Sequence, residues 1–237
     1  MIPLRDANPP HARPFVTWAI VALNVLVFGY QFSLGQGLRG VEFILDHGLV
    51  PALFVSDPLA AFPTLFTSLF LHAGWAHLLG NMIFLLVFGD NVEDRVGHLK
   101  FLLFYLIGGA VATGAHMLFA GTSLVPLVGA SGAISAVLGA YILLYPRQRV
   151  MTFIPPLFLP WLLLSLFARV PRFFMLWLPA WIFIGYWAFL QLLEAGQSFR
   201  VAQDGGVAWF AHVGGFLFGL ALAPALARLH QPGSIRP

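Results

Sequence analysis

The sequence predicts an all-α membrane protein, a bundle of six transmembrane helices. Hydrophobic residues make up 59% of the 237-residue chain and charged residues only 9%, whereas a soluble domain carries roughly 25% charged residues. The apolar residues form long continuous runs, which indicate helices rather than the alternating strands of a membrane barrel. Because each span takes about 20 apolar residues, six spans would use about half of the chain and leave room for one membrane domain.

The six predicted helices follow one another along the chain. They cover residues 15–34, 77–88, 101–120, 127–145, 178–193 and 207–227. The polar, proline-rich segment 1–14 precedes this membrane domain of residues 15–227, and residues 228–237 form a tail. Residues 35–75 form a long outer loop, which we expect to be partly helical and to lie at the membrane surface. The second helix is short unless residues 63–75 extend it.

The connection between the fourth and fifth helices, residues 146–172, is itself strongly apolar. Pro155, Pro156, Pro160 and Pro171 interrupt it, and proline breaks the backbone hydrogen bonding of a helix. We therefore expect residues 151–170 to form a broken hairpin or a shallow segment at the inner face, with deeper insertion as the alternative.

The basic residues predict the orientation of the chain in the membrane. If both termini are cytoplasmic, ten of the twelve basic residues lie inside and two outside, as the positive-inside rule requires. The ten are Arg5, Arg13, Arg95, Lys100, Arg147, Arg149, Arg169, Arg172, Arg228 and Arg236, and the two are Arg39 and Arg200. Because the short N-terminus lacks an Arg- and Ser-rich transit stretch, a bacterial inner membrane is favoured.

The composition also excludes several kinds of chemistry. The chain has no cysteine, so disulfides, thiolate metal sites and a cysteine nucleophile are excluded. A pI near 9.7 would suggest nucleic acid in a soluble protein, but here the basic residues are scattered singly. There is no HExxH zinc motif, and none of the predicted helices has the interior aspartates of an aspartyl protease. We expect no nucleic acid, metal or cofactor.

Two helices carry candidate catalytic residues on faces of small side chains. Ser131 stands in Gly-Ala-Ser-Gly at the start of the fourth helix, with Ser135 and Gly139 on the same face. His212 shares a face of the sixth helix with Gly215 and Gly219. Either pattern alone is typical of close helix packing. Together, the two faces would bring the Ser131 hydroxyl to the His212 imidazole, the arrangement of an activated nucleophile.

The second helix offers two hydrogen-bond donors. His77 and Asn81 lie one turn apart on one face and could stabilise an oxyanion together with the Ser131 N–H; simple hydrogen bonding between helices is the alternative. The second, fourth and sixth helices all start on the outer side. At about 1.5 Å rise per residue, their polar residues would share a depth of roughly 5 to 10 Å.

These segments resemble the rhomboid proteases. The resemblance rests on HAGWAHLLGNM at 72–82, FGDNVEDRVG at 88–97, the GASG serine and the AHVGG histidine, in that order. It implies a six-transmembrane-helix rhomboid-like bundle and a Ser131–His212 dyad. It also implies an oxyanion site made by His77, Asn81 and the Ser131 N–H, and single-span membrane proteins as substrates.

The resulting hypothesis is an intramembrane serine endopeptidase that cleaves transmembrane segments of other proteins. The alternative is a catalytically silent rhomboid-fold protein that binds membrane proteins or acts in quality control.

One departure from the family is Ser135, because an aromatic residue often occupies this position and stacks on the catalytic imidazole. Asp90, Glu93, Asp94 and Arg95 are expected to make structural ion pairs. Trp177, Trp181 and Trp187 are expected to lie at the membrane interface or face lipid, with the alternative that the fifth helix lines a substrate entrance.

Overall fold

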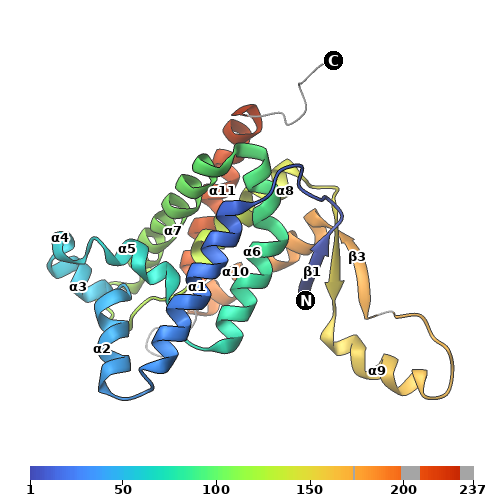
Figure 1. Ribbon diagram of the computed structural model, residues 1–237, viewed down its shortest axis with the longest axis horizontal. Coiled ribbons are helices and arrows are strands. Elements are labelled where there is room, and N and C mark those ends of the chain that lie inside the picture. The colour runs from blue at the N-terminus through green and yellow to red at the C-terminus, as the bar shows by residue number, and fades with distance from the viewer. Residues whose placement is uncertain (173, 199–208, 230–237) are drawn as a thin grey trace.

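The computed structural model describes residues 1–172, 174–198 and 209–229, and this part of the protein is mostly helical (Figure 1). The described elements are β1 (Ile2–Asp6), α1 (Phe15–Ser33), α2 (Leu38–His47), α3 (Pro51–Ser56), α4 (Pro58–Ala61), α5 (Thr64–Thr67), η1 (Ser68–Phe70), α6 (Trp75–Val96), α7 (His98–Ala120), α8 (Ser131–Leu144), β2 (Arg149–Phe153), α9 (Pro155–Ser165), β3 (Met175–Pro179), α10 (Ala180–Ser198) and α11 (Trp209–Leu229). The predicted start of the sixth helix at 207–208, Arg200, Arg236 and tail residues 230–237 lie outside the described residues.

Four of the six predicted helices qualify as membrane spans by length and composition. They are α1, α6, α7 and α11. Helices also form at the two other predicted positions, as α8 and α10, but these count among the shorter apolar helices. The second predicted helix, 77–88, is longer at both ends, because α6 begins two residues earlier at Trp75 and continues eight residues further to Val96. Residues 35–75, the predicted outer loop, are partly helical and contain α2 to η1.

The helices define two ends of the bundle. At one end α6, α8 and α11 begin, and we call this the Ser131 end. At the other end α1 begins while α6 and α8 finish, and we call this the Phe15 end. The turn between α6 and α7 at the Phe15 end consists of Gly97, whose φ of +85° is in the left-handed region that favours glycine.

The pairing of α8 with α11 forms the centre of the bundle. Every residue of α8 from Gly132 to Tyr141 is buried. A Cβ on Gly219 would lie 2.0 Å from the Ala136 carbonyl oxygen, and one on Gly139 would lie 2.2 Å from the Phe216 carbonyl oxygen. The two backbones therefore approach as closely as only glycine permits, through the small-residue faces that the sequence predicted.

The end of α6 holds the start of α1 at the Phe15 end. The buried Glu93 carboxylate accepts hydrogen bonds from the Val16 and Thr17 N–H groups at 2.9 and 2.7 Å. These amides would otherwise lack partners because they stand at a helix N-terminus, where a negative charge is also favourable. Glu93 thus caps α1 across a long stretch of sequence.

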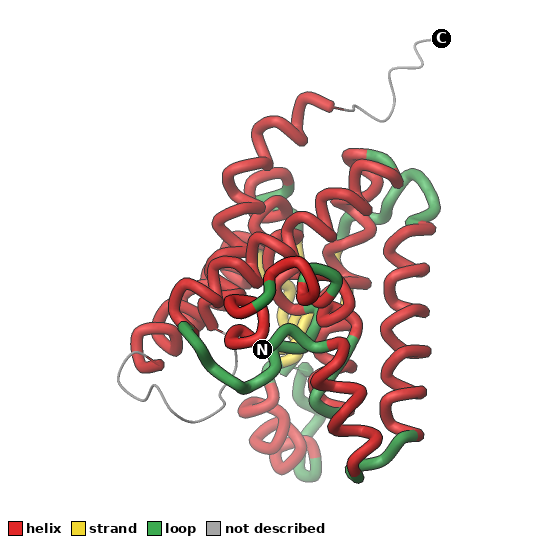
Figure 2. Tube along the Cα trace, turned by 90° about the vertical axis from the view of Figure 1, so that its left-hand side faces the viewer, coloured by secondary structure: helices red, strands yellow, loops and turns green. Residues whose placement is uncertain are grey.

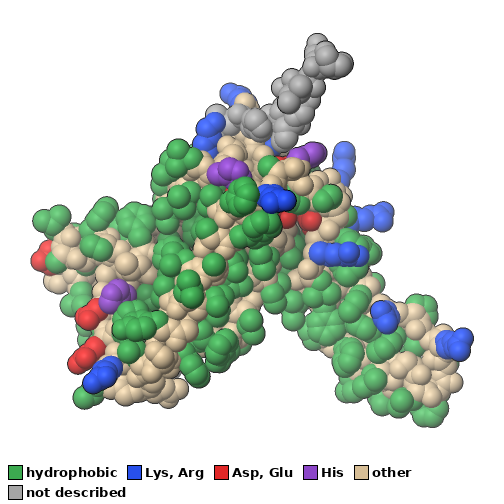
Figure 3. All heavy atoms as spheres, in the orientation of Figure 1, with side chains coloured by type: hydrophobic (Ala, Val, Ile, Leu, Met, Phe, Trp, Pro, Cys, Tyr) green, Lys and Arg blue, Asp and Glu red, His purple; other side chains and the backbone are tan. Residues whose placement is uncertain are grey.

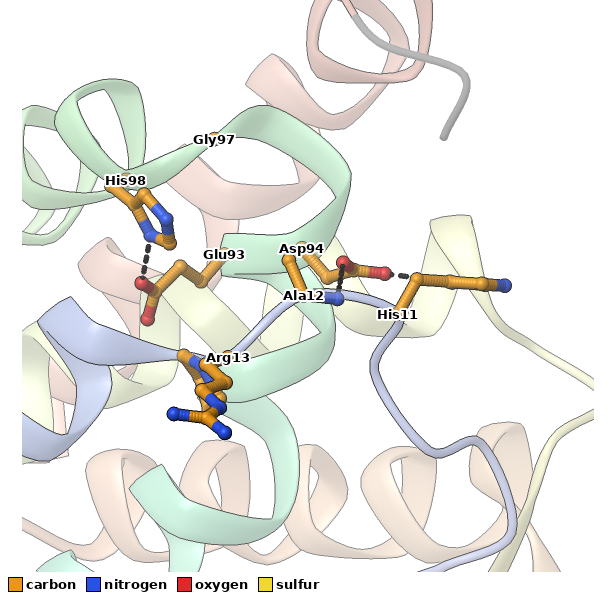
Figure 4. Close-up of a pocket in the computed structure, with 8 residues that line it drawn as sticks. His11, Ala12, Arg13, Glu93, Asp94, Gly97 and His98 are labelled. Carbon is orange, nitrogen blue, oxygen red and sulfur yellow. Dashed lines mark hydrogen bonds and ion pairs between the residues drawn. The ribbon is translucent and has the colours of Figure 1, made fainter. Parts of the chain in front are cut away.

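Among the described residues Arg95 makes no ion pair with the carboxylates of this cluster, and Glu93 and Asp94 contact histidines instead. Asp94 pairs with His11 at 3.0 Å and Glu93 with His98 at 2.5 Å, around a pocket of about 290 Å³ (Figure 4). Arg95 instead donates to the Ala227 carbonyl oxygen near the end of α11, at 2.7 Å. The cluster holds three segments together at the Phe15 end, far from Ser131.

A small β-sheet departs from the all-α prediction (Figure 2). Strands β1, β2 and β3 pair antiparallel in that order, with Ile2 opposite Phe153 and Arg149 opposite Pro179. The sheet is tied to the bundle by Asp6, whose carboxylate accepts from the Tyr141 hydroxyl at 2.6 Å. β1 has no local signal, because its partner β2 lies almost 150 residues along the chain.

Candidate active site

Ser131 is the first residue of α8. The backbone just before it, at Gly129, lies directly against His77 of α6. Gly129 has a φ of +123° and donates its N–H to the Ser68 carbonyl oxygen at 2.9 Å. A Cβ at Gly129 would lie 2.7 Å from His77 Nε2. Glycine is therefore needed here both for its conformation and for the space that the imidazole occupies.

His212 lies on the first turn of α11, directly against Ser131. Its Nε2 is 2.8 Å from the Ser131 Oγ, within the range of a hydrogen bond. The His212 residue is only 8% exposed. A Cβ at Gly215 would lie 2.1 Å from the Gly132 carbonyl oxygen, so the close backbone contact next to this pair sets its distance.

Gln191 of α10 holds the other side of the imidazole, and it is not among the residues that the sequence motifs predict. Its Oε1 lies 2.6 Å from His212 Nδ1, and its Nε2 donates to the Trp187 carbonyl oxygen at 3.4 Å. With Oε1 as acceptor, Nδ1 carries the proton and Nε2 is free to accept from Ser131. A polar amide on a largely apolar membrane helix was the signal that could have identified it.

Two tryptophans flank the His212 ring. Trp187 lies 6.2 Å from it in a tilted arrangement, and Trp209 lies 5.7 Å away edge-on. Trp187 is half-buried, and its ring packs against His212 and Phe216. Ser135 is fully buried and donates its hydroxyl to the Ser131 carbonyl oxygen at 2.6 Å. Aromatic contact with the imidazole comes from α10 and α11 rather than from position 135.

His77 and Asn81 of α6 face the loop immediately before Ser131. A Cβ at Gly129 would lie 2.7 Å from His77 Nε2 and 3.7 Å from Asn81 Nδ2. The Ala73 N–H donates to His77 Nδ1 at 3.4 Å, so Nε2 carries the proton and points toward Gly129. Asn81 is only 8% exposed, and its buried Nδ2 has no hydrogen-bond partner. Two donors therefore lie beside Gly129, two residues before Ser131, and the Asn81 donor is unpaired.

His72 lies behind His77 and supports it. The two rings meet edge-on with centroids 5.0 Å apart. Burial, reinforced by the nearby His77, lowers the pKa of His72 to about 4, so its ring is neutral near pH 7. Among the described residues, no group of three or more His, Cys, Asp or Glu side chains is placed to hold a metal ion.

Comparison with known proteins identifies the chain's family. A family model, the Rhomboid domain, matches residues 60–229. The rhomboid protease GluP of Bacillus subtilis is 31% identical over 141 residues, which cover 60% of this chain and 27% of the relative. Rhomboid protein 1, mitochondrial, of Saccharomyces cerevisiae is 26% identical over 209 residues, 86% of this chain and 51% of the relative. Rhomboid-like protein 11, chloroplastic, of Arabidopsis thaliana is 33% identical over 130 residues, 55% of this chain and 42% of the relative.

These relatives also show how much of a longer protein the chain matches and which membranes the family occupies. The chain spans only part of each relative's length, from about a quarter in one to about a half in another. Their names and sources are bacterial, mitochondrial and chloroplastic, so they do not support the bacterial inner membrane in particular. The apolar helices make this a membrane protein, and the family match covers its helices from α5 to α11, including Ser131 and His212. The chain belongs to the rhomboid family.

Proposed function

We propose that this protein is an intramembrane serine endopeptidase that cleaves transmembrane segments of other membrane proteins. The observation that carries the proposal is the 2.8 Å contact between His212 Nε2 and Ser131 Oγ. It has the geometry of a nucleophile and its general base. The third group is Gln191, which orients the imidazole as the carboxylate does in the serine protease triad, but without a charge.

In the proposed reaction, His212 takes the Ser131 proton while Oγ attacks the carbonyl carbon of the scissile peptide. The resulting oxyanion accepts hydrogen bonds from His77 Nε2, Asn81 Nδ2 and the Ser131 N–H. When the intermediate collapses, the C–N bond breaks and His212 gives its proton to the leaving amine. Water, deprotonated by the same imidazole, then hydrolyses the acyl-enzyme and releases the second product.

The unpaired Asn81 amide supports the proposed oxyanion site. A buried donor without a partner costs roughly 1 to 3 kcal/mol, and proteins usually avoid this cost. A donor held in place before the reaction needs no reorganisation when the negative charge develops. The vacant Nδ2 of Asn81 is therefore suited to bind the carbonyl oxygen of a substrate.

The proposal also covers which helices span the bilayer and on which side the termini lie. We place α8 and α10 inside the bilayer with the four longer helices, giving six helices in a domain of residues 15–227. Segment 1–14 and tail 228–237 are cytoplasmic in this arrangement. The Ser131 end then faces outward, at a depth that water can reach. The substrates are other transmembrane proteins in the same bilayer, and no cofactor takes part.

A serine-directed fluorophosphonate probe tests the proposal without knowledge of a substrate. We expect it to label Ser131 in the purified protein, as mapped by peptide mass spectrometry. The label should be lost in Ser131→Ala and His212→Ala but retained in Ser135→Ala, the matched control for a second serine on the same helix face. Folded protein that never reacts and cleaves no single-span substrate would support the silent rhomboid-fold alternative.

Gln191→Leu is expected to lower kcat by about 10- to 100-fold with little change in KM, because a misoriented catalytic group costs rate rather than binding. Gln191→Glu keeps an acceptor for Nδ1 and should recover most of that loss. Leu192→Ala is the control, since this neighbouring side chain is exposed on α10. Cleavage of a model single-span substrate in detergent provides the measurement. If Gln191→Leu cleaves at the normal rate, Gln191 does not position the imidazole.

A further inference from the structure

Between α8 and α10 the chain leaves the bundle as an arm, residues 149–179, which contains β2, α9 and β3. The arm projects sideways from the helices (Figure 1). Its base is at the Phe15 end, because β2 pairs with β1 and Asp6 of β1 contacts Tyr141 near the end of α8. The site around Ser131 is at the opposite end of α8, so the arm takes no part in it.

The arm has its own small aromatic core, which gives it a defined shape. The buried Phe174 ring lies 4.5 Å from Trp161, 5.3 Å from Phe158 and 5.9 Å from Phe153. The Ile154 N–H donates to the Phe174 carbonyl oxygen at 2.8 Å. These contacts hold α9 against the two strands. The surface that α9 presents is therefore preformed.

That surface is apolar almost throughout. No residue of α9 is buried, and the segment that follows it includes Leu166 at 69% and Phe167 at 90% exposure. Figure 3 shows hydrophobic side chains along much of the arm, with basic side chains among them. A continuous exposed apolar surface marks a membrane or protein interaction site. With 11 residues, α9 is about 16 Å long and too short to cross a hydrocarbon core of about 30 Å.

The charges on the arm indicate what kind of surface it binds. Between residues 146 and 193 the charged residues are all arginines, with no acidic residue among them. Arg147 and Arg149 are exposed at its base, and Arg169 and Arg172 are exposed beyond α9. Arg5 of β1 lies over the Trp177 ring at 5.4 Å. Basic residues that flank apolar and tryptophan side chains are typical of a segment bound to an anionic membrane surface.

We propose that the arm docks in the headgroup region of the leaflet at the Phe15 end and binds anionic lipids there. The α9 side chains enter the upper acyl region, while Arg169 and Arg172 contact lipid phosphates. This makes the arm a shallow lipid anchor instead of a seventh span. The proposal depends on the membrane location of the protein and does not require Ser131 to be a nucleophile.

The absence of cysteine from the chain allows a direct test. Leu163→Cys, an exposed position on α9, is labelled with bimane in the full-length protein, which is reconstituted in nanodiscs. The discs contain phosphatidylcholine alone or mixed with phosphatidylglycerol. Quenching by a headgroup nitroxide lipid reports the docked arm, and quenching by aqueous iodide reports the undocked arm. Ala12→Cys, exposed in the N-terminal segment, provides the aqueous reference.

We expect the bimane at position 163 to be quenched by the nitroxide lipid and protected from iodide in the anionic discs. Each basic residue near an anionic surface favours binding by about 5-fold. Adding Arg169→Gln and Arg172→Gln should therefore lower the docked-to-undocked ratio by about 25-fold in these discs and change it little in phosphatidylcholine. Arg13→Gln with Lys100→Gln removes the same charge from exposed positions at the Phe15 end and should leave docking unchanged.

Three results would overturn the proposal. Iodide quenching in every disc would show that the arm remains in water. Equal docking in both lipid mixtures, or full docking without Arg169 and Arg172, would remove the recognition of anionic headgroups. Protection that needs added membrane proteins would assign the arm to a protein partner.

Discussion

Replacing Ser131 with alanine is expected to lower the cleavage of a single-span substrate by at least about 10³-fold, as loss of the nucleophile does in other serine hydrolases. His212→Ala should cost about as much, because Oγ then has no base at the 2.8 Å position. The double variant should be no slower than either single variant, since residues that act as a unit do not contribute additively. The measurement is the single-turnover cleavage rate of purified protein in liposomes.

Ser135→Ala separates the nucleophile from its neighbour on the same helix face. It removes the hydrogen bond to the Ser131 carbonyl oxygen but no group that would contact the substrate. Its cleavage rate should stay within about tenfold of the parent, because one neutral hydrogen bond is worth about 1 kcal/mol. Normal cleavage by a folded Ser131→Ala variant would refute the assignment of Ser131 as nucleophile.

Asn81→Leu is expected to lower kcat by about 10²- to 10³-fold, the usual cost of losing one oxyanion donor. KM should change little, because the donor acts on charge that develops in the transition state. Stability should not fall, since Asn81 Nδ2 has no partner in the free protein. Replacing an unpaired buried donor with an apolar group of similar size can even stabilise a protein.

The stability measurement distinguishes this role from the simpler one, in which Asn81 only bonds between helices. Thermal unfolding in detergent should show an equal or higher midpoint for Asn81→Leu. A clearly lower midpoint would favour the interhelical role, and an unchanged cleavage rate would remove Asn81 from the site. His77→Phe offers a second donor deletion that keeps the ring beside Gly129 and His72.

The sequence predicts Ser131 and His212 as site residues because both lie in local patterns with a physical meaning. Small residues one and two turns from each, Ser135 and Gly139 after Ser131 and Gly215 and Gly219 after His212, predict which faces of the fourth and sixth helices meet. No comparable pattern predicts Gln191, because its contact with His212 depends on how α10 is rotated against α11. The same holds for Trp187, whose position beside His212 depends on that rotation as well.

The sequence by itself determined the membrane class, the position of the apolar helices and the family motifs, since hydropathy and small-residue spacing are local properties of the chain. Only the tertiary structure decided three other features. These are the Gln191 contact with His212, the cap that Glu93 provides for α1, and the sheet that shapes the arm. Each joins residues far apart in sequence, so its energy depends on a geometry that no single segment encodes.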